Sequence, residues 1–403
     1  MKRFSTALVL AVALCAQAQE SVRPELAKPL QQAQELIKAG KAREALAQLK
    51  QADAITGRTP YEAFVLERMR GSAAALAGDQ ELMLKAFDAV LAAGRLTADE
   101  QVKVLEAQAS AAFRIKDYSR SAGYARRAIA QGSTSAAARM LFVQAMFSAQ
   151  QYADAARELA SQVRAAEQQG RIPSELELQL LANCQSKMND RSGYGETLLR
   201  LVTSYPKKEY WSAVLSRLRN QPGFADRLAL DLYRIRQATG VWSGAEDDVE
   251  MAQLALQAGV PAEAKRVIEA GYAAGRLGTG AEADRHRRLR DLALKQAAED
   301  ARNADDELAQ AKDAQVLVKL GLALVMSGQV DKGLGAIDRG LAKGGLKHPD
   351  DATLHYGVAL VAAGRTAQAR ELFRQIRGGD GSADLARLWM AHLAGATPSS
   401  TPK

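Results

Sequence analysis

The sequence of 403 residues has few of the residues that build sheets, disulfide frameworks or membrane spans. Aromatic residues make up 5% of the chain, which is too few for an all-β fold. Two cysteines exclude a disulfide-rich scaffold, and beyond the first 20 residues no apolar run is long enough to cross a bilayer. The abundant residues are Ala, Leu, Glu, Lys, Arg and Gln, which favour helices, and a hydrophobic fraction of 47% excludes wholesale disorder.

Sequence motifs of catalysis and metal binding are also missing. The four histidines, His286, His348, His355 and His392, show no paired-ligand spacing, and we expect His286 to lie on a solvated helix face. Neither a phosphate-binding GxxxxGK[ST] loop nor a GxSxG nucleophile motif occurs. The glycine-rich segment 275–280 is interpreted as a linker, with phosphate binding as the alternative. The sequence therefore predicts no catalytic site, no cofactor and no metal.

The first 18 residues have the pattern of a cleavable signal peptide. Lys2 and Arg3 precede an apolar segment over 7–16, and a small-x-small site ends at Ala18. The prediction is cleavage after Ala18 and a periplasmic or secreted protein, with lipidation at Cys15 as the alternative. Cleavage removes two positive charges from a chain whose formal net charge is +8, which leaves a balance too modest to identify a partner.

After cleavage, Cys184 is the only thiol of the chain. It lies at helical spacing from Leu180 and Leu181, which favours a small buried core residue. A reactive or intermolecular thiol is the alternative.

One pattern of helix, turn and alanine-rich second helix recurs about every 36 residues. The predicted turn residues are Gly40, Gly78, Lys116, Gln150, Asn189, Gly223, Gly259, Gly328 and Gly364. The one double interval, between Gly259 and Gly328, indicates a degenerate repeat at 281–313.

Small and large side chains recur at fixed distances from the predicted turn residues. The residue seven positions before the turn is small in nearly every repeat, and in three it is glycine, at Gly71, Gly321 and Gly357. The residue nine positions after the turn is always apolar, as at Phe87 and Phe373. This register predicts close helix–helix contact at the small residue, with the large residue packed beside it.

These features resemble the tetratricopeptide repeat (TPR) family, over roughly Leu26 to Arg377. The matching positions are the small residue before the turn, the turn glycine and the Ala and Phe or Leu positions of the second helix. The family's aromatic near the first helix start is seldom present, and its closing proline is clear only at Pro206. The resemblance implies an all-α fold, a right-handed superhelical solenoid of stacked helix-turn-helix repeats.

The expected organisation has six parts. They are a signal peptide at 1–18, about seven TPR-like repeats at 19–280, the degenerate charged repeat at 281–313, two further repeats at 314–380, a C-terminal capping helix at 381–395 and a disordered tail at 396–403.

The family geometry also implies a concave groove lined by the first helix of each repeat. The candidate partner-binding residues form a polar strip with two cations that could hold an extended peptide, with ordinary hydrated lining as the alternative. They are Gln144, Gln179, Asn183, Lys187, Arg217 and Asn220. The Lys and Asn combination of the family's carboxylate-clamp members is matched only by Asn183, so recognition of a free C-terminus is not expected.

The equivalent positions in the last repeats are apolar: Val318, Leu322, Leu354 and Val358. They predict either a drier contact surface or packing against a neighbouring segment.

The most concentrated charge is basic over 285–291 and acidic over 299–307. We interpret it as a solvated helix whose opposite charges pair along its surface. The alternative is a site for an acidic protein, anionic lipid or cell-wall polymer. Nucleic acid is not expected, because no aromatic residues are interleaved for base stacking.

The sequence thus predicts a non-catalytic exported scaffold or adaptor that binds another envelope protein or peptide in its groove. The segment 205–211 is similar to repeat proteins that accompany TonB-type systems, so a TonB-type or envelope-export machinery is an alternative role. A cell-wall polymer-binding protein is another, although the exposed aromatic platforms that sugars favour would have to come from Trp211, Trp242 and Trp389. A helical lytic enzyme is the alternative with least support, and the oligomeric state stays open.

Overall fold

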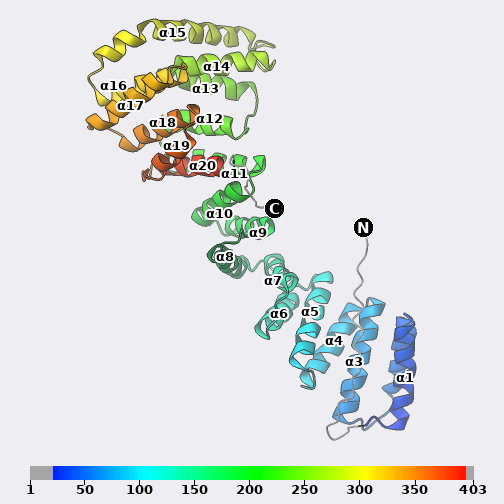
Figure 1. The fold of residues 1–403 in the computed structure, drawn as a ribbon. Coiled ribbons are helices and arrows are strands. Elements are labelled where there is room, and N and C mark those ends of the chain that lie inside the picture. The colour runs from blue at the N-terminus through cyan, green and yellow to red at the C-terminus, as the bar shows by residue number, and fades with distance from the viewer. Residues whose placement is uncertain (1–20, 396–403) are drawn as a thin grey trace, which may run out of the picture. The chain divides into compact units, whose positions relative to one another are not determined.

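The computed structural model describes residues 21–395, and within that range it contains twenty α-helices, one 3₁₀ turn and no strand (Figure 1). The predicted all-α class is confirmed. The chain divides into two compact units, unit 1 ending at Asn189 and unit 2 beginning at Asp190. The predicted signal peptide and C-terminal tail lie outside the described residues.

Unit 1 is a stack of antiparallel helix pairs. The first helices of neighbouring pairs touch, α1 against α3, α5 against α7 and α7 against α9, whereas the second helices make no comparable contact within the described residues. The side on which helices approach most closely is the inside of a curved stack, so the first helices line the inner side of unit 1. The helices are α1 Pro24–Lys38, α2 Ala42–Ala52, α3 Pro60–Ala77, α4 Gln80–Ala92, α5 Ala98–Arg114, α6 Tyr118–Ala130, α7 Ala136–Ser148, α8 Tyr152–Gln168 and α9 Glu175–Lys187.

The first helices begin at strong local signals. At the start of α9, the Ser174 side chain accepts a hydrogen bond from the backbone N–H of Glu177, whose carboxylate in turn accepts one from the N–H of Ser174. The starts of α3 and α5 have the same reciprocal arrangement, at Thr59 and Thr97. Such capping boxes satisfy backbone donors that the helix leaves free, so the sequence sets where these helices begin.

All nine predicted turn residues adopt a left-handed backbone conformation, with φ between 55° and 93°. Six are glycines. The other three, Lys116, Gln150 and Asn189, are the non-glycine residues with positive φ within the described chain. The turn prediction is therefore confirmed residue by residue, including the three positions where the expected glycine is absent.

Replacing Lys116 or Gln150 with glycine is expected to stabilise the fold. The left-handed conformation costs an L-residue about 1–2 kcal/mol, and the greater unfolded-state entropy of glycine offsets only part of this. We expect the free energy of unfolding to rise by about 0.5–1 kcal/mol, measured by urea denaturation. Lys103→Gly, at an exposed position inside α5, is the matched control and should lower it by about 1 kcal/mol; equal losses in all three variants would contradict the assignment.

The predicted size register produces close packing within helix pairs. A Cβ atom added at Gly71 would lie 2.5 Å from the ring of Phe87, and one added at Gly357 would collide with the ring of Phe373. At Gly321 the added atom would lie 2.6 Å from the backbone oxygen of Gly333. Each glycine thus lets its helix approach the second helix of the pair more closely than any other residue would.

Unit 2 closes on itself. Its last helix, α20, packs against α10 and α12 as well as α18 and α19, and the backbone N–H of Ala225 donates to the carbonyl of Asp380 at 2.9 Å. The helices are α10 Arg191–Ser204, α11 Lys208–Arg219, η1 Asp226–Leu228, α12 Ala229–Ala238, α13 Ala245–Ala258, α14 Pro261–Ala273, α15 Ala283–Gln310, α16 Ala314–Met326, α17 Val330–Lys343, α18 Pro349–Ala362, α19 Thr366–Phe373 and α20 Ser382–Gly395.

This closure determines the role of the apolar positions predicted in the last repeats. Val318, Leu322, Leu354 and Val358 are all buried. They pack against neighbouring segments of unit 2 and do not form an exposed contact surface, so the second of the two predicted alternatives is the one observed.

Candidate functional site

Four of the predicted groove residues lie on first helices of unit 1. Gln144 is on α7, and Gln179, Asn183 and Lys187 follow one another along one side of α9. Asn183 and Lys187 are exposed, while Gln144 and Gln179 are partly buried. All four therefore belong to the first helices, as the sequence analysis expected.

The structure adds an apolar residue that the sequence reasoning missed. Leu176, one turn before Gln179 on the same side of α9, is 47% exposed. On α5, the corresponding positions are the half-buried Glu106 and Ser110, and the carboxylate of Glu106 accepts a hydrogen bond from the hydroxyl of Ser133. We call these side chains on α5, α7 and α9 the inner strip.

The other two predicted groove residues belong to unit 2. The guanidinium of Arg217 donates to the carbonyl of Arg191 at 2.9 and 3.2 Å and to Gln221 at 3.2 Å, and it packs over Gly195. The side-chain amide of Asn220 donates to the Ser216 carbonyl of its own helix. Arg217 is therefore already occupied in joining α11 to the start of α10.

A hollow of about 180 Å³ lies beside Arg217, between α10, α11 and α20. Its charged lining is paired, since Arg387 forms ion pairs with Glu196 at 2.9 Å and with Asp384. These internal pairs leave little charge to attract a ligand.

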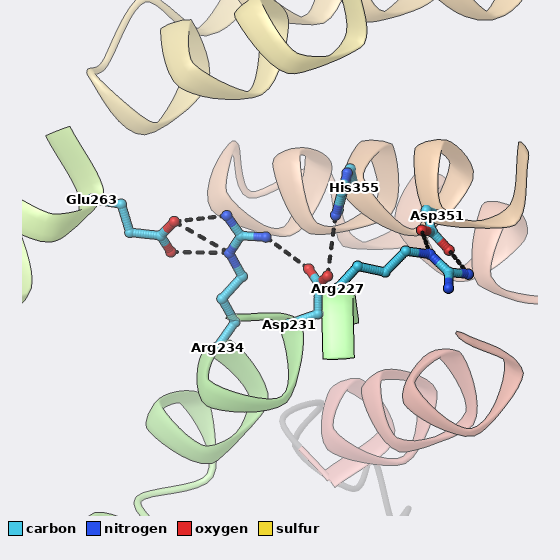
Figure 2. A network of polar contacts seen from close by, with 6 residues as sticks. All are labelled: Arg227, Asp231, Arg234, Glu263, Asp351 and His355. Atoms are coloured by element: carbon cyan, nitrogen blue, oxygen red, sulfur yellow. Dashed lines mark hydrogen bonds and ion pairs between the residues drawn. The ribbon is translucent and has the colours of Figure 1, made fainter. Parts of the chain in front are cut away.

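A buried network of charges lies at the centre of unit 2 (Figure 2). Arg234 on α12 donates to Asp231 at 2.7 Å and to Glu263 on α14 at 2.7 Å. Asp231 also contacts Nε2 of His355 on α18 at 3.1 Å. Asp231 and Glu263 are 1% exposed and Arg234 is 5% exposed, so these charges are satisfied by one another and not by bulk water.

A second set of ion pairs extends this network toward the C-terminus. Arg227 of η1 donates to Asp351 at the start of α18 at 2.6 Å (Figure 2). Arg227 also pairs with Asp380, which precedes α20. These ion pairs join residues more than 120 positions apart in the sequence. They connect η1 and α12 to α18 and thereby stabilise the closed arrangement of unit 2; we call this set of ion pairs the clamp.

The electrostatics of the network favour its ionised form. Burial alone would raise the pKa of Asp231, but the charges of His355 and Arg234 outweigh this effect and lower the pKa to about 2. Burial opposes the charge of Arg234, yet the carboxylates of Glu263 and Asp231 raise its pKa overall.

This depressed pKa predicts a stability that depends on pH. A carboxyl whose pKa is lowered by folding contributes fully above its unfolded pKa of about 3.9, and the contribution is lost as the pH falls through its folded pKa of about 2. Asp231→Asn should be less stable than the wild type by about 2 kcal/mol at pH 6, and in urea titrations the gap should shrink to less than about half of that by pH 2.5. An equal gap at both pH values would contradict this assignment.

The pairing of His355 with Asp231 resembles part of a catalytic triad, but the other part is not seen. Within the described residues, no hydroxyl or thiol group hydrogen-bonds to His355, and no group of three or more potential metal ligands occurs. Asp231 therefore orients the imidazole of His355, but no nucleophile lies within hydrogen-bonding distance of the ring in the described residues.

None of the described helices is both long and apolar enough to span a bilayer.

Two other sequence interpretations are resolved. The prediction that His286 lies on a solvated face is wrong: its side chain is buried, and its Nδ1 accepts a hydrogen bond from the backbone N–H of Gly278 at 3.2 Å. Cys184 is fully buried as predicted, and burial raises its thiol pKa to about 11.

No protein-family model matches the sequence, and the search of curated proteins gave no match. Solved structures with similar folds include the Naa15/Naa10 complex bound to HypK-THB, with 14% identity, a TM-score of 0.33 and 89% of this chain covered. This chain spans 58% of that chain. A tetratricopeptide repeat protein from Parabacteroides merdae has 11% identity and a TM-score of 0.32, with 86% of this chain and 99% of that chain covered. The P58(IPK) TPR domain has 10% identity and a TM-score of 0.26, with 93% and 99% covered.

The nine left-handed turns, the paired helices and the glycine contacts within the pairs identify the repeat from the chain's own geometry. The part of the chain that the structure describes is a tandem array of helix pairs, similar to the arrangement in tetratricopeptide repeat proteins.

Proposed function

We propose that this protein is a non-catalytic scaffold of the cell envelope that holds an extended segment of another envelope protein against the inner strip of unit 1. Stacked helix repeats typically serve protein–protein interaction through such extended inner surfaces. The observation that carries the proposal is the line of polar side chains on three consecutive first helices, partly exposed on α5 and α7 and most exposed on α9.

The chemistry of the inner strip suits a peptide backbone. Amide side chains such as Gln144 and Asn183 both donate and accept hydrogen bonds, Lys187 favours an acidic side chain, and Leu176 offers an apolar contact. Neighbouring helices lie about 10 Å apart, and an extended chain advances about 3.3 Å per residue. A segment of about six residues would therefore cross all three helices.

The tryptophans speak against the alternative of a cell-wall polymer as the ligand. Trp211 and Trp389 are buried in unit 2, where they pack against His392. They are therefore unable to serve as platforms for sugar rings. Trp242, the third candidate, is partly exposed, but its indole N–H donates to Asp248 at 3.0 Å and its ring packs edge-on against Tyr233. A protein segment is therefore the better-supported occupant.

Export is tested by the mass of the protein purified from cells. Cleavage after Ala18 gives a chain that begins at Gln19, whereas Ala18→Leu should leave the precursor uncut, because the cleavage site requires a small residue. An unprocessed wild-type chain in the cytoplasm, or a lipid-modified Cys15, would contradict this part of the proposal.

The inner strip is tested by photo-crosslinking in intact cells. A photoreactive residue at Gln144 or Asn183 should give the same protein adduct, whereas one at Arg157 or Arg164, exposed on the second helix α8, should not. Adducts of equal yield from α8, or none from either inner-strip position, would contradict the proposed binding surface.

A further inference from the structure

The long helix α15 has a face that is left uncovered by the rest of residues 21–395. It has 28 residues, about 42 Å, and its buried residues, His286, Leu289 and Ala293, all lie in its first half. The second half, beyond Ala293, has no fully buried residue. The second half of the helix is therefore packed less closely within unit 2 than the first half.

The charged side chains of α15 are distributed unfavourably with respect to the helix dipole. Its first ten residues contain four arginines, and residues 299–307 contain five acidic side chains. The N-terminus of a helix favours negative charge and the C-terminus positive charge, so this distribution weakens the isolated helix. Locally unfavourable arrangements of this kind are expected at functional sites.

The outer face of α15 presents a regular row of residues, spaced alternately by four and three positions. We call this row the outer seam; it comprises Arg288, Leu292, Lys295, Glu299, Arg302 and Asp306. Leu292 is 44% exposed, Glu299 is partly exposed and the other four are exposed.

The charged members of the outer seam are not paired along the helix surface as the sequence interpretation expected. The ion pairs at the start of α15 join Arg285 to Glu282 and Arg287 to Asp284, and Lys332 of α17 pairs with Asp305. Within the range 21–395, no hydrogen bond or ion pair occupies Arg288, Lys295, Glu299, Arg302 or Asp306 themselves.

We propose that the outer seam of α15 binds the same seam of a second copy of this chain, with the two helices antiparallel. A two-fold axis beside position 297 places Arg288 opposite Asp306 of the other copy and Lys295 opposite Glu299 of the other copy. Leu292 then faces Arg302, whose aliphatic stem can cover it. Symmetry repeats each pairing, so one helix face supplies both halves of the interface.

Charge complementarity selects this occupant and this direction. In a parallel pair each seam residue would meet its own copy, which would set arginine against arginine and aspartate against aspartate. A uniformly acidic or basic partner would be attracted by one half of the helix and repelled by the other. Only a partner with reversed polarity satisfies both halves, and an antiparallel second copy has that polarity.

The test uses two variants of the full chain with opposite changes in charge. R288E/K295E leaves Arg302 as the one basic residue of an otherwise acidic seam, and E299K/D306K makes every charged seam residue basic. Each variant alone should be monomeric at concentrations where the wild type dimerises, because like charges face each other. An equimolar mixture should form a one-to-one heterodimer, since the 288/306 and 295/299 pairs are then all opposite in sign, and sedimentation velocity distinguishes these states.

The quadruple variant R288E/K295E/E299K/D306K is the matched control. Its polarity is reversed as a whole, so it should dimerise like the wild type, and its charges now agree with the helix dipole. Raising the salt from about 50 to 500 mM should weaken wild-type dimerisation about tenfold or more through screening. A wild type that stays monomeric at about 100 µM, or a dimer that either double variant leaves intact, would overturn the proposal.

Discussion

Replacing Arg234 with methionine is expected to lower the free energy of unfolding by about 3–5 kcal/mol, because it leaves two buried carboxylates without their shared cation. Asp231 and Glu263 are both 1% exposed, so water cannot take over the role of the guanidinium. The loss would be measured by urea denaturation, followed through a probe in unit 2.

Arg266→Met is the matched control for this change. Arg266 lies near the same carboxylate, 3.9 Å from Glu263, but its side chain is 55% exposed. Exposed ion pairs contribute at most about 1 kcal/mol, so its removal should cost little. The double variant Arg234→Met/Glu263→Met should cost less than the sum of the single changes, because it removes a cation together with one of its carboxylates. A small loss for Arg234→Met would contradict the clamp.

Replacing Gly321 with alanine is expected to cost about 3 kcal/mol, as for severe overpacking of a core. The added Cβ would lie 2.6 Å from both the backbone oxygen of Gly333 and a side-chain carbon of Ile337. A backbone oxygen cannot rotate away, so α16 and α17 must separate and lose their contact. The midpoint of thermal or urea unfolding would report the loss.

Gly335 provides the control on the facing helix. It is exposed on α17, and an added Cβ would meet no atom within 4 Å. Gly335→Ala should therefore raise stability by about 0.5–1 kcal/mol through the entropy of the unfolded chain. If Gly321→Ala changed the stability as little as Gly335→Ala does, the result would contradict the close packing of α16 against α17 at Gly321.

The sequence was sufficient to predict the local repeat. Turn residues and the small-to-large register depend on contacts within one helix pair, and those contacts recur at a fixed spacing. Positions such as Gly78 and Phe87 therefore carry the signal directly. Lys116 and Gln150 were identified by spacing alone, even though neither residue type favours the left-handed conformation that both adopt.

The closure of unit 2 could not be predicted in the same way. It depends on small rotations that accumulate from repeat to repeat and bring α20 against α10 and α12. The partners of the charge network, such as Asp231 and His355, are more than 120 residues apart, so no local pattern links them. A single signal, an Asp and Arg at helical spacing in α12, could have drawn attention to one corner of the network.

The groove residues could be predicted only in part, because their contacts also depend on the tertiary fold. Spacing placed Gln144 and Asn183 on first helices, but it could not show that Arg217 and Asn220 are engaged within unit 2. It also gave no weight to Leu176, because exposure of an apolar residue depends on the tertiary fold.

The most direct test of the proposed scaffold is the affinity of the inner strip for the protein that crosslinks to it. The triple variant Gln144→Ala/Asn183→Ala/Lys187→Ala should raise the Kd of that protein at least about tenfold, which corresponds to about 1.4 kcal/mol. The control Arg157→Ala/Arg164→Ala on α8 should change it less than about twofold, within about 0.4 kcal/mol. Equal effects of the two variants, or an unchanged Kd for the triple variant, would contradict binding along the first helices of unit 1.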